Sequence, residues 1–243
     1  MTGEAAVRLN KYSEVRESIY GKHVRSSDML LTGLIYGCTA VSLLILVGIL
    51  GYTFVRGIPH VTWSFLSTAS SAVKGTFGIL GNIINTIYIV VITLLIATPI
   101  GVGSAVYLNE YAKPGKIVRM IEFTTETLSG IPSIIFGLFG MVFFGNTIGL
   151  GYSILTGSLT LTLMILPLIT RTTQEALKTV PDSYRHGALG IGATKWYMIR
   201  TILLPSAMPG IVTGVILAIG RIVGESAALL FTAGSGYYLP KNI

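Results

Sequence analysis

The sequence predicts an all-α integral membrane protein with about five transmembrane helices. Hydrophobic residues make up 51% of the 243 residues and charged residues only 11%, whereas soluble domains carry roughly 25% charged residues. Residues 29–55, 75–109 and 127–170 contain no Asp, Glu, Lys or Arg. Because about 20 apolar residues cross a bilayer as a helix, each run is long enough to span. The strands of a membrane β-barrel would alternate apolar and polar residues instead.

The expected helices follow from these runs. The first is not a signal peptide, because its run is too long and 28 mostly polar residues precede it without a cleavage pattern behind. The last run holds two helices, and the glycine-rich stretch at residues 145–151 supplies the turn between them. A fifth helix begins near Ser206. In all, helices are expected at about residues 29–55, 80–108, 120–144, 152–174 and 206–233.

Basic residues are distributed unevenly between the two sides of this topology. Thirteen lie in the N-terminal segment, in the loop after the second helix and in the stretch that closes the fourth, whereas Arg56, Lys74 and Lys241 lie on the other side. Cytoplasmic loops are enriched in Lys and Arg. We therefore expect a cytoplasmic N-terminal segment at residues 1–28 and a transmembrane domain at 29–243 with a cytoplasmic loop at 175–205. The net charge of +7 reflects topology and does not indicate nucleic-acid binding.

The loop PDSYRHGALGIGATKWYMIRTILLP, residues 181–205, is patterned throughout. Asp182 or Ser183 is suited to cap a short helix of residues 184–190. Gly190 and Gly192 are suited to end it, because glycine accepts the left-handed conformation of a C-cap. Thr194 is suited to cap a second short helix, which is amphipathic and typical of a membrane interface. From physical chemistry alone, an ordinary cytoplasmic loop with helix caps explains the pattern equally well. The apolar residues of the second helix are Trp196, Ile199, Ile202 and Leu203.

The spacing of this loop resembles the cytoplasmic motif of ABC importer permeases, E-A-A-x3-G-x9-I-x-L-P. Five of seven positions agree, while His186 stands in place of Glu and Gly187 in place of the first Ala. Longer stretches closely resemble the permease subunits of ABC phosphate importers, the PstA type. These stretches are residues 81–112, 126–140, 171–196 and 219–234.

The resemblance implies a type I ABC importer permease that moves inorganic phosphate across a prokaryotic plasma (inner) membrane. It implies as partners two copies of an ATPase subunit, a second homologous permease, and a soluble phosphate-binding protein outside the cell. In that family the short helix of the loop docks into a cleft on the ATPase, which implies the same here. The residues assigned to this coupling loop are Ser183, Tyr184, Arg185, His186, Gly187, Ala188, Gly192, Ala193, Ile202, Leu204 and Pro205.

The fifth helix carries two charges, Arg221 and Glu225, on the helical face of Gly210, Gly214 and Ala218. Charges within a membrane are costly and usually face a cavity or a partner, and small residues let another helix approach closely; we expect the second permease there. An internal salt bridge that fixes packing is one interpretation. We favour a substrate-anion site, because an arginine fork matches oxyanion geometry and Arg before Glu is the less favourable order of an i,i+4 pair.

Three further charges lie near the cytoplasmic side. Arg171 is either a second pathway cation or an anchor to lipid headgroups. Glu122 and Glu126 are expected to be acids favoured by the dipole at a helix start rather than pathway residues. Kinks are expected at residues 130–133 and 98–99, for packing more than for binding substrate.

The sequence carries no motif for catalysis. A phosphate-binding G-x4-G-K-[ST] loop, a hydrolytic triad and a metal cluster are absent, and Cys38 is the only cysteine. No catalytic residue, metal or cofactor is therefore expected, and ATP hydrolysis falls to a separate subunit. The alternatives are a permease for another oxyanion, such as sulfate or molybdate, and a channel or scaffold that needs no ATPase.

The resembled permeases have six membrane spans, whereas five are expected here. The fifth leaves residues 234–243 on the outer side. We therefore expect that a sixth helix of about 20 apolar residues is missing.

Overall fold

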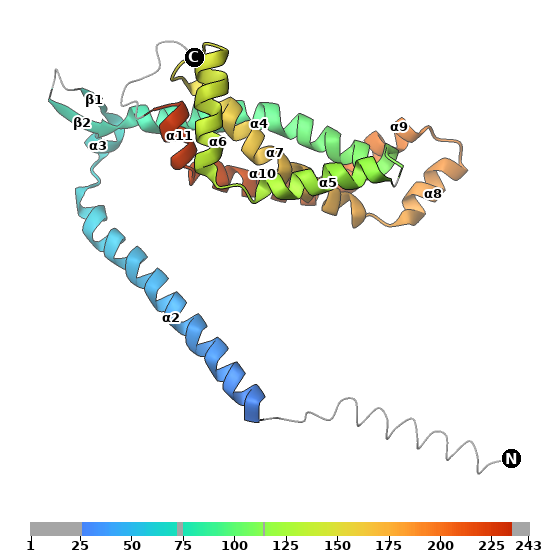
Figure 1. Cartoon of the computed structure of the whole chain (residues 1–243), viewed down its shortest axis with the longest axis horizontal. Helices are drawn as coiled ribbons and strands as arrows, with labels where there is room; N and C mark the ends of the chain where they lie inside the picture. The colour runs from blue at the N-terminus through green and yellow to red at the C-terminus, as the bar shows by residue number, and fades with distance from the viewer. Residues whose placement is uncertain (1–25, 72–74, 114, 235–243) are drawn as a thin grey trace. The chain divides into compact units, whose positions relative to one another are not determined.

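The computed structural model describes residues 26–71, 75–113 and 115–234 (Figure 1). They belong to two compact units, Met1–Thr62 and Trp63–Ile243. The expected cytoplasmic segment before residue 26, Lys74, and the expected outer tail after residue 234 with Lys241 lie outside the described residues. By length and composition, four described helices are able to cross a membrane, or five if one bent pair counts as a span.

The first unit contains helix α2 (Ser26–Gly57) and the short 3-10 helix η1 (Ile58–His60). Thr39 and Thr53 of α2 donate their hydroxyls to the carbonyls of Ile35 and Ile49, each at 2.8 Å. Polar side chains that bond within their own helix suit an apolar surrounding, where water cannot satisfy them. The predicted first helix at 29–55 is thus confirmed within one turn at each end.

A small hairpin opens the second unit and departs from the all-α expectation. After helix α3 (Trp63–Ser67), strands β1 (Ala69–Ser71) and β2 (Thr76–Ile79) pair antiparallel. Thr76 donates its hydroxyl to the Ala69 carbonyl at 3.1 Å, which ties the strands together. Strands this short leave no hydropathy period to read in the sequence.

Helix α7 (Ile154–Lys178) is the centre of the second unit and contacts α4 (Leu80–Val106), α5 (Lys116–Ser129), α6 (Ser133–Gly140) and α10 (Leu204–Val223). In Figure 1, α4, α5, α7 and α10 run along one another. Small residues make these contacts close: a Cβ on Gly101 of α4 would lie 2.8 Å from the Ile169 side chain. In a membrane, such close packing holds helices together without a hydrophobic driving force.

The predicted single helix at residues 120–144 is wrong. Helix α5 ends at Ser129, and α6 with the π-helical segment η3 (Met141–Thr147) leaves it at an angle of 98°. Pro132 explains the break, because proline has no amide hydrogen to donate and disfavours helical conformation in the residue before it. The kink expected at residues 130–133 is therefore present, whereas α4 continues as one helix through Pro99.

The predicted fifth helix at residues 206–233 is displaced. The helical stretch begins at α9 (Lys195–Met198), continues through the π-helical turn η4 (Ile199–Leu203) into α10, and ends at Val223. A break at residues 224–226 separates it from α11 (Ala227–Thr232). The expected second short helix is therefore not separate, because it continues into α10. Its Ile199 and Leu203 are buried in the bundle, while Trp196 is exposed.

The face of Gly210, Gly214 and Ala218 is buried within the chain. A Cβ on Gly210 would lie 2.5 Å from the Cβ of Ala176, and one on Gly214 would meet Thr172, both residues of α7. Ala218 has no exposed surface. The expectation that a second permease packs on this face is therefore wrong, because α7 of the same chain already covers it.

Candidate functional site

A cavity of about 140 Å³ lies among the π-helical turn η2 (Tyr107–Tyr111), α5, α7 and α10. This volume is several times the ~10–15 Å³ that one water needs by the same kind of measure. Its charged and amide-bearing walls are Glu122, Glu126, Arg171, Gln174 and Arg221.

Arg171 is held on the cavity wall by two carboxylates. Its Nη1 lies 3.4 Å from Glu126 Oε1 of α5, and its Nε lies 3.3 Å from Glu175 Oε1 one turn along α7. All three side chains are about half exposed, so these ion pairs contribute little stability. They do hold the guanidinium between α5 and α7, where Arg171 lines the cavity.

Arg221, in the last turn of α10, lines the same cavity. Among the described residues it forms no ion pair and no side-chain hydrogen bond. Arg221 is exposed in this chain, and a charged side chain within a membrane span usually faces a cavity or a partner. The arrangement leaves its five N–H donors free for a ligand that enters the cavity.

Glu225 does not lie on the same helix as Arg221. The helix ends at Val223, so the expectation that both charges share one helical face is wrong. Glu225 Oε1 instead accepts a hydrogen bond from the backbone N–H of Ala228 at 3.0 Å, at the start of α11. It is not among the residues that line the cavity.

Glu122 and Glu126 lie further from the start of their helix than the sequence indicated. Helix α5 begins at Lys116, so neither glutamate is in its first turn, and the dipole interpretation is wrong. Both line the cavity. Two carboxylates and two guanidiniums therefore line it, so the formal charges of these four side chains cancel.

The loop predicted to couple to an ATPase folds as helix α8 (Asp182–Gly190) and a turn. Gly192 has φ of +84°, as expected for a left-handed residue, and Thr194 accepts a hydrogen bond from the N–H of Tyr197 at 3.3 Å. The predicted cap at Asp182 or Ser183 is wrong, because Pro181 occupies that position.

The remaining coupling residues are distributed over three elements. On α8, Ala188 is buried, whereas Ser183, Tyr184, His186 and Gly187 are exposed. Ala193 lies in the turn, partly buried. Ile202 lies in η4, and Leu204 and Pro205 open α10, so the second half of the motif belongs to the bundle and not to the exposed helix.

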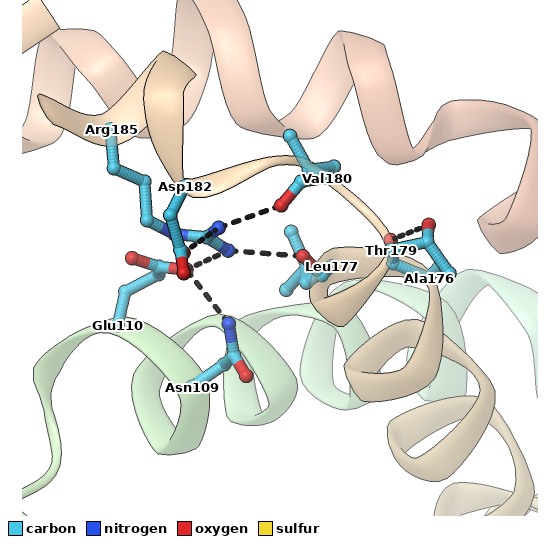
Figure 2. Close-up of polar contacts among 8 residues, drawn as sticks. All are labelled: Asn109, Glu110, Ala176, Leu177, Thr179, Val180, Asp182 and Arg185. Atoms are coloured by element: carbon cyan, nitrogen blue, oxygen red, sulfur yellow. Dashed lines mark hydrogen bonds and ion pairs between the residues drawn. The ribbon is translucent and has the colours of Figure 1, made fainter. Parts of the chain in front are cut away.

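Arg185 connects α8 to the bundle (Figure 2). It lies against Glu110 of η2, with Nη2 2.9 Å and Nε 3.2 Å from Oε1. It also donates to the carbonyls of Leu177, in the last turn of α7, and of Val180, just beyond its end, at 3.0 and 2.9 Å. Carbonyls at the end of a helix lack a full set of helical partners. A fifth bond reaches Asp182 at 3.0 Å.

The Arg185 network is buried, since the side chain of Glu110 is 6% exposed and that of Arg185 18%. Asn109 donates a further hydrogen bond to Glu110 Oε1 at 2.7 Å. All five arginine donors are used. The network therefore fixes α8 to the ends of α4 and α7 as a rigid unit.

Sequence reasoning missed two residues of these sites, Glu110 and Gln174. Glu110 ends the long uncharged run at residues 75–109, and a buried charge at the end of a span is a signal that it has a partner. Gln174 lies one turn from Arg171 on α7. Helical spacing from Arg171 would have placed it near the same cavity.

Comparisons with known proteins agree with this geometry. Residues 97–243 match the model of the family described as "Binding-protein-dependent transport system inner membrane component". The chain is 43% identical over 208 residues to "Probable ABC transporter permease protein YqgI" of Bacillus subtilis, a match that covers 86% of this chain and 71% of the relative. It is 35% identical over 219 residues to "Phosphate transport system permease protein PstA" of Haemophilus influenzae, covering 90% and 77%.

A solved structure has the same architecture. An inward-facing form of the MetNI methionine ABC transporter contains a chain that aligns with a TM-score of 0.54 and 25% identity. The alignment covers 65% of this chain and 74% of the other.

Proposed function

Because the chain belongs to the family of inner membrane components of binding-protein-dependent transport systems, we propose that it is a permease subunit for inorganic phosphate. An ABC importer permease is a membrane protein and not itself an enzyme. The observation that carries the phosphate proposal is the cavity that brings Arg171 and Arg221 together. Guanidinium forks bind phosphate oxygens in pairs, and the relative of Haemophilus influenzae is named as a phosphate permease.

The cavity is suited to transport rather than to tight storage of an anion. Arg171 is already partly neutralised by Glu126 and Glu175, whereas Arg221 has no partner in the described ranges. An entering anion gains the free guanidinium and shares the paired one. Glu122 and Glu126 weaken the binding of a dianion, since like charges repel each other.

We further propose that ATPase subunits, two per transporter, bind the exposed side of α8 and that this end of the bundle faces the cytoplasm. The Arg185 network supports this assignment, because a rigid helix fixed to α4 and α7 is able to transmit displacement into the bundle. A second permease, a soluble phosphate-binding protein outside the cell and a cytoplasmic N-terminus complete the proposal. Glu225 remains outside the proposed pathway, as a residue that orders the start of α11.

The substrate is tested by uptake in vesicles that contain the assembled transporter and its binding protein. Labelled phosphate is supplied with ATP inside or outside, according to orientation, and unlabelled phosphate, sulfate or molybdate competes. We expect unlabelled phosphate alone to suppress uptake. Suppression by sulfate or molybdate at equal concentration would identify a permease for another oxyanion, and uptake that continues without ATP would identify a channel.

The ATPase contact is tested at Gly187, on the exposed side of α8. A side chain there meets nothing within 4 Å in this chain, so Gly187→Arg should leave the fold intact and obstruct only a docked partner. We expect the variant to lose phosphate-stimulated ATP hydrolysis and to retain less ATPase subunit on purification. Gly57→Arg, at the end of α2, serves as the matched control, because a side chain there likewise meets nothing within 4 Å. Normal coupling in Gly187→Arg would contradict docking on this side of α8.

A further inference from the structure

A second cavity adjoins the first. It measures about 320 Å³ and lies between the start of α5, the end of α7 and η2. Three residues line both cavities: Leu108, Glu122 and Gln174. The two spaces are therefore neighbours, and we call the wall of these three residues that they share the neck.

The second cavity carries its own positive charges. Arg119 of α5 and Lys178, the last residue of α7, line it, and neither forms an ion pair among the described residues. Gly115 also lines it and is the N-cap of α5. The free N–H groups at the start of a helix of this length favour a nearby anion. Two unpaired cations and a helix start are together suited to a small oxyanion.

The neck carries an amide that is open to a ligand. Gln174 is 4% exposed, and its side chain makes no hydrogen bond within the part of the chain that the structure describes. Its amide atoms are not among the fully buried polar atoms without a partner, so they are accessible from the cavities that Gln174 lines. Of the three shared side chains, only the Gln174 amide carries N–H donors, because leucine has none and an ionised Glu122 only accepts.

An anion that crosses the neck needs a donor at this point. It leaves the guanidiniums of Arg171 and Arg221 and passes the carboxylate of Glu122, which repels it. The neutral amide of Gln174 offers hydrogen bonds at the place where the two cavities meet, without holding the anion as strongly as a further charge would.

From the shared walls and the unpartnered amide, we propose that Gln174 is a substrate-binding residue. It passes the oxyanion from the cavity of Arg171 and Arg221 to a second anion site bounded by Arg119 and Lys178. The proposal rests on the proposed function, since it takes the first cavity as the anion's route. It adds a second binding site and the residue that connects the two.

The test compares Gln174→Met with Thr173→Val in reconstituted vesicles. Methionine keeps the length and shape of glutamine but has no N–H donor. Thr173 is the matched control: it is fully buried beside Gln174, its hydroxyl is likewise without a hydrogen bond, and it lines neither cavity. Both variants should assemble with the ATPase, which gel filtration checks before uptake is measured.

We expect kcat/KM for labelled phosphate to fall about tenfold to a hundredfold in Gln174→Met, the usual effect of losing a hydrogen bond to a charged group. Thr173→Val should stay within about twofold of wild type. The second site is measured separately, by loading unlabelled phosphate on the side that receives the transported anion. Wild-type uptake should then be inhibited, and Arg119→Gln with Lys178→Gln should require about tenfold more internal phosphate.

The outcomes separate this proposal from the proposed function. Wild-type phosphate uptake with Gln174→Met equal to Thr173→Val would overturn the role of Gln174 and leave the phosphate permease in place. Unchanged internal inhibition in the double variant would overturn the second site. If wild type instead carries sulfate or molybdate, the same comparisons with that anion decide the proposal. If wild type carries no oxyanion, both proposals are wrong.

Discussion

Two arginines of this bundle have opposite surroundings. Arg185 uses all five of its N–H donors on Glu110, Asp182 and backbone carbonyls of the same chain. Arg221 lines a cavity and has no such partner among the described residues. A guanidinium whose donors are all used stabilises the fold, whereas one left without partners in an apolar bundle is available to a ligand. The number of partners within the chain, and not the residue type, thus distinguishes an arginine that stabilises the fold from one that is available to a ligand.

The largest effect on stability is expected from Arg185→Met. It would leave Glu110 buried and unpaired, and breaking one side of a buried pair costs about 3–5 kcal/mol of unfolding free energy. Thermal unfolding of the purified protein in detergent measures the loss. The double variant Glu110→Gln with Arg185→Met should recover most of it. A single variant as stable as wild type would show that the network contributes nothing.

Arg221→Gln is expected to reverse this pattern. Uptake should fall about a hundredfold or more, because a charged hydrogen-bonding group that meets the anion is lost. The unfolding free energy should not decrease, since no internal partner is left behind. Arg221→Lys should also transport poorly, as a point charge cannot bind two oxygens side by side. Full uptake by Arg221→Gln at equal expression would reduce the residue to a packing role.

For Arg171→Gln, we expect a smaller loss of stability than in Arg185→Met and a smaller loss of uptake than in Arg221→Gln. Its ion pairs with Glu126 and Glu175 are half exposed, so their loss should cost less than about 1 kcal/mol of stability. Uptake should fall about tenfold, because Arg221 still faces the cavity. A loss of uptake as large as that of Arg221→Gln would mean that the two guanidiniums act as one unit.

The smallest change in stability and uptake is expected from a substitution of His186, the exposed neighbour of Arg185. His186→Glu restores the residue of the resembled motif, and surface substitutions usually change stability by less than about 0.5 kcal/mol. Uptake should stay within about twofold of wild type. A large change in uptake at constant stability would indicate that this position contacts the ATPase directly.

Much of the fold was accessible from the sequence because hydropathy marks membrane helices strongly. The helices at residues 29–55 and 80–108 and the turn after Gly145 agree with α2, α4 and the loop before α7. The errors arose where backbone chemistry overrides hydropathy. Pro132 breaks an apolar run that looks continuous, and the break after Val223 removes Glu225 from the face of Arg221.

The candidate site was only partly accessible for a different reason. Arg171 and Arg221 were identified because charges in apolar runs are conspicuous. Their juxtaposition with Glu126 depends on the contact between α5 and α7, which no local pattern encodes. Gly210 and Gly214 were recognised as a packing face, but a single sequence does not show whether the neighbour belongs to the same chain or to another.

Substrate protection tests most directly whether an anion occupies the cavity of Arg171 and Arg221. In a Cys38→Ser background, Thr125→Cys places a thiol on the cavity wall, and Lys116→Cys places one on an exposed part of the same helix. The rate of modification by a small charged thiol reagent is measured in the assembled transporter, with and without phosphate. We predict that phosphate slows modification of Thr125→Cys several-fold and leaves Lys116→Cys unchanged. Equal rates at Thr125→Cys with and without phosphate, in a transporter that takes up phosphate normally, would place the anion's route elsewhere.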